Sequence, residues 1–255
     1  MPLQPLPPSS TSLLNKAPAV EVIYSIRTAL PEAIDINKFQ EAVKRNFPSE
    51  FTEFQEFRTV QGAVTLKQDG STDGQLHTDA IGFRCLNKDK TFLAHYLLQG
   101  LTLNFLRPYP GYDSALDQMK RHWAVYREVI GEVPITALSL RYIDRIDIPR
   151  PETGSLDLDT YFTIVSKIPD GLSAHHCYQQ YWLNDPASDV RARVIWSSLE
   201  NLPGHFSFAL DTEAMLDPAN IADMGEGWTR FNDLHAWCTH VFDHSTTDTC
   251  KALFQ

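Results

Sequence analysis

The chain has 255 residues, of which 43% are hydrophobic and 21% are charged, and its formal net charge is −10 at pH 7. This is the composition of a globular protein that is long enough to bury a sizeable core. The acidic balance argues against general binding to nucleic acids, because affinity for phosphate groups depends on basic side chains. No run of apolar residues approaches the length of a membrane span, so we expect no membrane insertion.

The first 16 residues, MPLQPLPPSSTSLLNK, are rich in proline and lack a basic segment followed by an apolar core. They are predicted to form a flexible tail rather than a secretory signal, with a proline-rich docking peptide as the alternative. The four cysteines are widely separated and include no CxxC pair: Cys85, Cys177, Cys238 and Cys250. They are therefore predicted to be reduced thiols in a cytoplasmic protein.

Residues 17–133 are predicted to form the first of two halves. The stretch APAVEVIYSIRT begins it with apolar side chains at every second position, the period of a half-buried strand. A helix is expected over 35–47 and another over 114–131, because apolar residues recur there at helical spacing. Five segments between these helices read as strands: 51–60, 63–68, 80–87, 91–99 and 101–109. The Gly-, Asp-, Ser- and Thr-rich residues around 69–80 are predicted to be a loop.

Residues 134–255 are predicted to repeat this order of elements. A strand over 135–149 is followed by an expected helix over 155–168, and a helical region closes the chain over 228–254. Three strands are expected between them: 175–185, 190–200 and 205–216. The sequence thus predicts an α+β fold of two related strand-helix-strands-helix halves that share one extended antiparallel sheet, with the helices mainly on one face. Residues 17–255 are expected to form a single globular domain.

The stretch ITALSLRYIDRIDIPRP, residues 135–151, carries an unusual density of charge for a strand. Alternation places Tyr142 and Asp144 on the apolar face, and Arg141, Arg145 and Asp147 on the other face. One interpretation is that Asp144 pairs with an arginine of a neighbouring strand. The other is that Arg141 and Arg145 line a groove and grip an anion or an acidic segment of a partner.

Several segments together resemble a known family. They are APAVEVIYSIR, the W-x-x-Y spacing of Trp123 and Tyr126, LSLRYIDRIDIP, FALDTE and LHAWCTHVFDHSTTD. The chain is similar to a sporadically distributed prokaryotic family of about this length, whose members carry the signature R-Y-[IV]-N-R-I-[DE]-[IL]-P. Five of the six positions that the signature fixes to one residue match: Arg141, Tyr142, Arg145, Ile146 and Pro149. At the sixth, Asp144 stands where Asn is commoner. The family has no assigned activity, and its patchy distribution implies mobile genes such as toxin–antitoxin or phage-defence loci.

Other candidate sites in the sequence have simpler explanations. His235, Cys238, His240 and His244 have spacings that a metal site can use, but the HExxH pattern is missing, and we expect surface or capping histidines and no metal. Asp211 and Glu213 share a strand face and are read as a solvated strand end rather than as catalytic carboxylates. Nucleophile-elbow and nucleotide-binding motifs are absent from the sequence, so we assign no catalytic residue and no cofactor.

Aromatic residues are abundant, and those of the expected strands over 175–200 are predicted to lie mostly in the core: Tyr178, Tyr181, Trp182 and Trp196. Exposed aromatics beside arginines would instead suit protein recognition.

We therefore expect a non-catalytic protein-binding or regulatory protein, such as the neutralising or sensing component of a defence or toxin–antitoxin locus. Its partner is expected to be another protein, with a basic patch or an acidic segment engaged. The candidate binding residues are Arg141, Tyr142, Asp144 and Arg145. The alternatives are a small-molecule or nucleotide sensor with a pocket between sheet and helices, and an uncharacterised hydrolase.

Overall fold

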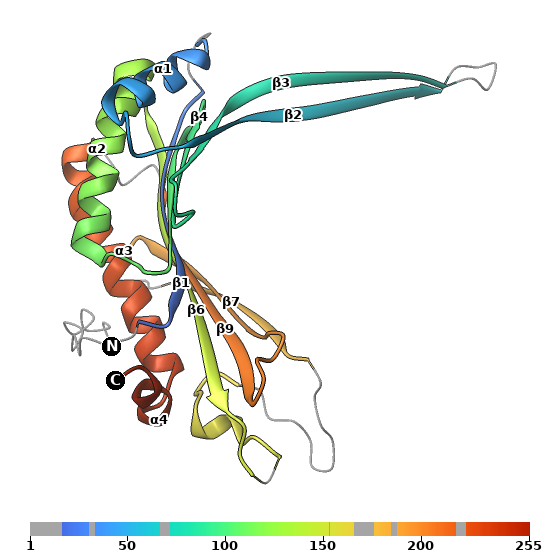
Figure 1. The fold of residues 1–255 in the computed structure, drawn as a ribbon, viewed down its shortest axis with the longest axis vertical. Helices are drawn as coiled ribbons and strands as arrows, with labels where there is room; N and C mark the ends of the chain where they lie inside the picture. Colours follow the sequence, from blue (N-terminus) through green and yellow to red (C-terminus); the bar gives the residue numbers. More distant parts are fainter. Residues whose placement is uncertain are drawn as a thin grey trace.

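The computed structural model describes residues 17–30, 34–66, 72–152, 154–165, 176–184, 188–217 and 223–255. These residues form an open, nine-stranded antiparallel sheet with the order β2-β3-β4-β5-β1-β6-β9-β8-β7. The long helices lie together on one face of the sheet (Figure 1). The predicted α+β class, with one extended antiparallel sheet and helices mainly on one face, is confirmed.

The first half of the chain supplies five strands and two helices: β1 (Ala19–Thr28), α1 (Asn37–Asn46), β2 (Glu53–Leu66), β3 (Thr72–Leu86), β4 (Phe92–Leu97), β5 (Gly100–Leu106) and α2 (Tyr112–Ile130). The second half supplies four strands and the C-terminal helices: β6 (Ile135–Pro149), the 3-10 helix η1 (Leu158–Thr160), β7 (Tyr178–Asn184), β8 (Val190–Ser198), β9 (His205–Leu216), α3 (Met224–Ser245), α4 (Asp248–Lys251) and the 3-10 helix η3 (Ala252–Phe254).

The strand order has the same form in both halves. The first strand of each half, β1 or β6, lies at the centre, and these two strands pair with each other. The last strand of each half pairs with that central strand, as β5 does with β1 and β9 with β6. The remaining strands follow outwards in reverse sequence order. The junction of the two halves is therefore the middle of the sheet.

The helix expected over 155–168 does not form in the described part of that segment, which contains only η1. The backbone there bonds to the C-terminal region instead: Thr163 donates to the carbonyl of Ser245, and Tyr161 accepts from the amide of Thr247. Phe162 and Thr246 also form an isolated β-bridge. These groups are satisfied by distant partners, so no helical ladder is needed. Residues 166–168 of the prediction lie outside the described residues.

The β2–β3 hairpin projects from the sheet as a long two-stranded arm (Figure 1). The loop predicted around 69–80 is wrong for residues 72–80, which form β3 and pair with β2, since cross-strand pairing satisfies their backbone despite a turn-like composition. Only residues 82–86 of β3 also pair with β4. The arm leaves the sheet at Gly82, whose φ is +154° and where a Cβ atom would lie 2.1 Å from the carbonyl oxygen of Tyr96. This close approach requires glycine.

The core lies between the sheet and the helices, and the periodic patterns of the sequence predict it well. The apolar stripes of α1 and α2 are buried: Phe39, Val43, Phe47, Leu116, Met119, Trp123, Tyr126 and Ile130. On β6, the predicted apolar face is buried at Leu138, Leu140, Ile146 and Ile148. The opposite sheet face is polar, with bonds such as Ser25 Oγ to Thr102 Oγ1 at 3.1 Å.

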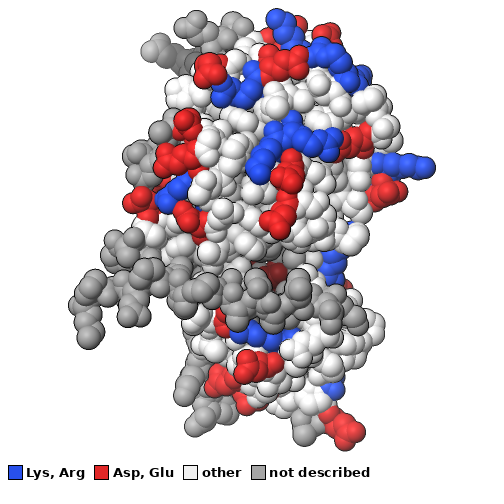
Figure 2. Space-filling model, turned by 90° about the vertical axis from the view of Figure 1, so that its left-hand side faces the viewer, with Lys and Arg blue, Asp and Glu red and all other residues white. Residues whose placement is uncertain are grey.

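The helical face carries charges of both signs. Over its described part, Lys and Arg alternate with Asp and Glu and do not gather into one basic field (Figure 2). Ion pairs on α1 and α2 contribute to this pattern, including Arg45 with Glu128 and Lys120 with Asp117. None of the helices in the described part of the chain combines the length and the apolar character that spanning a bilayer requires.

Candidate functional site

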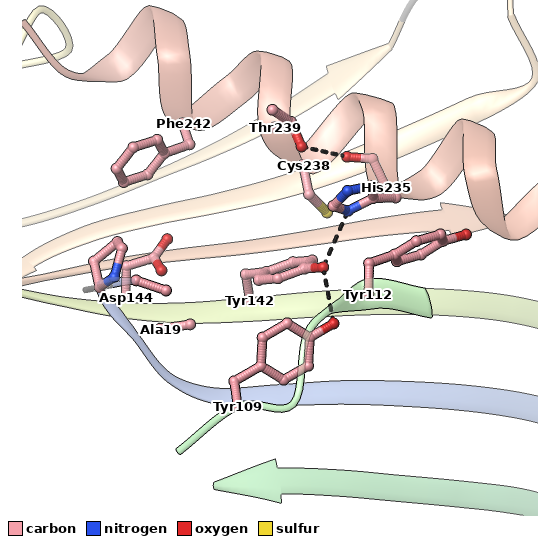
Figure 3. Close-up of a pocket in the computed structure, with 11 residues that line it drawn as sticks. Ala19, Tyr109, Tyr112, Tyr142, Asp144, His235, Cys238, Thr239 and Phe242 are labelled. Atoms are coloured by element: carbon pink, nitrogen blue, oxygen red, sulfur yellow. Dashed lines mark hydrogen bonds between the residues drawn. The ribbon is translucent and has the colours of Figure 1, made fainter. Parts of the chain in front are cut away.

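A pocket lies beneath α3, at the junction of the two halves (Figure 3). Its volume is about 280 Å³. The residues before and at the start of β1, the loop that leads into α2, the middle of β6 and one face of α3 line it: Ala17, Pro18, Ala19, Tyr109, Tyr112, Tyr142, Asp144, His235, Cys238, Thr239 and Phe242. Residues from both halves thus enclose one space.

Asp144 is the acidic group of this pocket. It is only 5% exposed, and its cross-strand neighbours on β9 and β1 are Leu210 and Ala19. Its carboxyl group points into the space below α3 (Figure 3). Burial raises the pKa of this carboxyl group to about 7, although the positive charge of Arg107 acts in the opposite direction.

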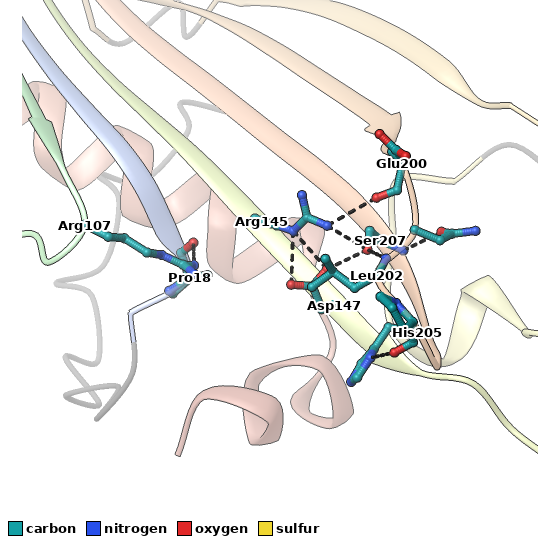
Figure 4. Close-up of polar contacts among 10 residues, drawn as sticks. Pro18, Arg107, Arg145, Asp147, Glu200, Leu202, His205 and Ser207 are labelled. Carbon is teal, nitrogen blue, oxygen red and sulfur yellow. Dashed lines mark hydrogen bonds and ion pairs between the residues drawn. The ribbon is translucent and has the colours of Figure 1, made fainter. Parts of the chain in front are cut away.

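The prediction that Asp144 pairs with an arginine of a neighbouring strand is wrong. Among the described residues, no ion pair or hydrogen bond engages its carboxyl group. Arg107 donates instead to backbone carbonyls, from Nε to Ala19 at 3.0 Å and from Nη2 to Pro18 at 2.6 Å (Figure 4). These carbonyls compete for the guanidinium because the chain before β1 runs beside Arg107.

A row of hydroxyl groups forms the polar edge of the pocket. The hydroxyl of Tyr109 lies 3.0 Å from that of Tyr24 and 3.4 Å from that of Tyr142, which in turn lies 3.0 Å from Nδ1 of His235. The ring of Tyr112 stacks on the His235 ring, with centroids 4.1 Å apart. Burial lowers the pKa of His235 and raises the pKa of Tyr109 and of Tyr142, so these groups are uncharged at neutral pH.

The thiol of Cys238 faces the sheet, where Sγ lies 3.5 Å from the carbonyl oxygen of Leu140. Burial raises the pKa of this thiol, so it is not a thiolate at neutral pH. Further along α3, the rings of His240 and His244 lie 3.9 Å apart, whereas His235 bonds to Tyr142. In the described part of the chain, no group of three or more His, Cys, Asp or Glu residues is arranged to hold a metal ion.

On the open face of the sheet, Arg141 forms an ion pair with Asp211 of β9. Its Nε lies 2.7 Å from Oδ1 of Asp211 and its Nη2 lies 2.5 Å from Oδ2, which is bidentate geometry. On the adjacent strand β8, Arg193 pairs with Glu213 at 2.8 Å. The Asp211 and Glu213 carboxylates, which share a strand face as predicted, are therefore each engaged by an arginine.

Arg145 belongs to a separate network on the same face (Figure 4). Its Nε lies 3.0 Å from Oδ1 of Asp147, and its Nη2 donates to Oγ of Ser207 and to the carbonyl oxygen of Glu200. Oγ of Ser207 donates in turn to Asp147 at 2.6 Å. A partner that bound Arg145 would have to compete with these contacts.

The structure therefore separates the four predicted binding residues. Tyr142 and Asp144 line the pocket, whereas Arg141 and Arg145 lie on the other side of the sheet in ion pairs. Several pocket residues were not predicted: Tyr109, Tyr112, Thr239 and Phe242. The sequence does hold a signal on α3, because His235, Cys238, Thr239 and Phe242 follow the i, i+3, i+4, i+7 spacing of one helical face.

The aromatic residues of β7 and β8 have different environments. Trp196 is buried at 1% exposure, as predicted, but Tyr178, Tyr181 and Trp182 are 65%, 37% and 61% exposed. The prediction of a core position is wrong for these three residues, because β7 is the last strand of the sheet and, within the described residues, no helix covers its open face. Tyr178 and Trp182 lie four residues apart on one face of β7.

Comparison with protein-family models gives no match, and comparison with curated proteins gives none either. The function therefore has to be inferred from the geometry of the pocket.

Proposed function

We propose that the chain is a non-catalytic small-molecule sensor whose ligand binds in the pocket beneath α3. The observation that carries this proposal is Asp144, a buried carboxyl group that faces a cavity and has no partner among the described residues. A largely buried carboxyl group without a hydrogen bond to the protein costs stability, and such a group calls for a specific explanation, such as a bound ligand. Convergence of such a group with aromatic walls is typical of a ligand site.

Binding, rather than catalysis, is the activity that the lining residues support. The Cys238 thiol is the candidate nucleophile, but it is protonated and directed at the backbone of Leu140. His235 is engaged by Tyr142 and stacked on Tyr112. A sensing role follows from location, because a ligand there would contact both halves and stabilise their packing. Four unpaired thiols support a cytoplasmic location.

A thermal-shift screen of a metabolite library tests this proposal, using the wild-type chain and a Thr239→Phe variant that fills the pocket from α3. The control is Thr229→Phe, the same substitution at an exposed position of the same helix. We expect compounds that raise the Tm of the wild type and of Thr229→Phe but not that of Thr239→Phe. A screen without such compounds, or with equal shifts in all three proteins, would overturn the proposal.

A second candidate function is protein binding through the open face near β7, favoured by the exposure of Tyr178 and Trp182. Tyr and Trp concentrate binding energy at protein interfaces. The product of the neighbouring gene should then co-purify with the wild type and not with a Tyr178→Ser, Trp182→Ser variant. Retention by the variant would exclude this surface.

A further inference from the structure

The chemistry of the pocket restricts the class of ligand, and this inference rests on the proposed function. Among the described residues that line it, only Asp144 carries a carboxyl group, and none is Lys or Arg. The Asp144 residue is 5% exposed. The charge of Arg107 acts on Asp144, but its guanidinium is held by the carbonyls of Pro18 and Ala19. Ionisation of Asp144 therefore leaves a buried negative charge that a cation from outside can neutralise.

The walls suit a cation with an apolar body. Tyr109, Tyr112, Tyr142 and Phe242 all line the space, and aromatic faces attract positive charge. His235 does not compete as a cation, because burial lowers its pKa and its Nδ1 faces the Tyr142 hydroxyl. Both oxygens of Asp144 lack protein donors within the described residues, so N–H groups on the ligand would satisfy them.

We propose that the pocket binds an organic ammonium ion whose N–H donors bond to Asp144 while its apolar body packs against the tyrosine rings. A dry cavity of roughly 150 Å³ accommodates benzene, so a cavity of about 280 Å³ suits a ligand of roughly ten non-hydrogen atoms. Anions are disfavoured by the carboxylate. Quaternary ammonium ions are disfavoured because they would leave its oxygens without hydrogen bonds.

Isothermal titration calorimetry with four probes of similar size tests the ligand class. The expected ligand is 2-phenylethylammonium; the matched alternatives are neutral 2-phenylethanol, anionic phenylacetate and benzyltrimethylammonium, a cation without N–H donors. We expect 2-phenylethylammonium to bind more tightly than the other three. Asp144→Asn should weaken its binding about 10- to 100-fold, because a charge-assisted hydrogen bond is lost. The control Asp113→Asn, which removes the same charge from an exposed position near the pocket on α2, should leave affinity within about twofold.

The pH dependence gives a second measurement that needs no variant. The wild-type affinity for 2-phenylethylammonium should rise about tenfold between pH 6 and pH 8, as the Asp144 carboxyl group, with a pKa of about 7, ionises. Burial raises the pKa of the neighbouring Tyr109, Tyr142 and Cys238 and lowers that of His235, so burial disfavours a charge on each of these groups. Arg107 and Asp211 act on the pKa of Asp144 in opposite directions. Affinity that is constant or falls with pH contradicts the inference.

These measurements also distinguish failure of the ammonium inference from failure of the sensor proposal. Tight binding of the alcohol or the acid that Thr239→Phe abolishes would overturn the ammonium inference and leave the sensor proposal intact. Unchanged affinity of the ammonium probe in a folded Asp144→Asn variant would overturn the inference as well. If no probe binds, the inference fails, and the metabolite screen decides the sensor proposal independently.

Discussion

The hydroxyl of Tyr142 on β6 lies 3.0 Å from Nδ1 of His235 on α3, a contact between residues 93 positions apart in the chain. It holds the helix against the centre of the sheet at one wall of the pocket. Through Tyr109, the same row of hydroxyls reaches Tyr24 on β1, so that the two central strands and α3 share one hydrogen-bonded chain.

Tyr142→Phe removes one hydroxyl from this row and keeps the ring. We expect the free energy of unfolding to fall by about 1 to 3 kcal/mol, because Nδ1 of His235 is left in a largely buried position without a partner. Urea denaturation followed by tryptophan fluorescence measures the change. Tyr178→Phe is the control, since its hydroxyl bonds to Gln180 at an exposed site, and its effect should be within about 0.5 kcal/mol. Equal effects of the two substitutions would contradict a structural role for the row.

Asp144→Asn should change how stability depends on pH. The pKa of this carboxyl group is about 7 in the folded state, against an ordinary value of 3.8, so the folded protein retains a proton that the unfolded chain releases. The contribution of this group to the free energy of unfolding is fully present below pH 4. It is lost as the pH rises to about 7, by up to about 1.4 kcal/mol per pH unit. The stability of Asp144→Asn relative to the wild type should therefore increase from pH 5 to pH 7 and level off above.

Urea denaturation of both proteins at pH 5, 6, 7 and 8 measures this difference in the free energy of unfolding. The contributions of the other titrating groups cancel, because both proteins contain them. Asp113→Asn serves as the control because its side chain is exposed at the start of α2. A constant difference between Asp144→Asn and the wild type across this range would show that Asp144 ionises normally in the folded protein.

Arg141→Met should destabilise the protein, because Asp211 would lose its bidentate partner in a position that is only 8% exposed. We expect a loss of about 2 kcal/mol in chemical denaturation, with part of it recovered in the double variant Arg141→Met, Asp211→Asn. Arg191→Met is the control: its ion pair with Asp217 has both side chains 51% exposed, and its loss should cost about 0.5 kcal/mol or less. An Arg141→Met variant as stable as Arg191→Met would mean that the guanidinium is available to a partner.

His122→Phe should flatten the loss of stability in acid. His122 is fully buried, with Nδ1 2.6 Å from the hydroxyl of Tyr96 and Nε2 3.3 Å from Oε1 of Glu50. Burial lowers its pKa, in spite of Glu50 and in the same direction as Arg121. The contribution of the neutral His122 ring to the free energy of unfolding is thus present above pH 6.5. It is lost as the pH falls below this value, by up to about 1.4 kcal/mol per pH unit.

We expect His122→Phe to have a lower free energy of unfolding than the wild type at pH 7. This difference in free energy should become smaller towards pH 5. Tyr96→Phe is the matched control, because it removes the hydrogen bond to Nδ1 of His122 and keeps the titrating ring. Its difference in free energy of unfolding from the wild type should stay nearly constant with pH. A gap for His122→Phe that does not change with pH would show that His122 titrates normally.

The alternation of side chains along residues 135–149 was sufficient to predict the two faces of β6. A strand directs successive side chains to opposite faces, so Leu138, Leu140, Ile146 and Ile148 had to be buried together once one face was covered. The stripes of α1 and α2 follow from helical spacing in the same way. These are local rules, and the sheet class, the order of most elements and the place of Asp144 on an apolar face all follow from them.

Only the tertiary structure decided that Asp144 lines a pocket on the apolar face of the sheet. It also decided which groups the arginines contact. Arg141 meets Asp211 from a position 70 residues later, and Arg107 is held by carbonyls at the start of β1. The pocket is made by segments as distant as Tyr109 and Phe242. A sequence gives the side chains and their local period, but pairing and enclosure depend on which strands and helices become neighbours, and that is set by the packing of the whole chain.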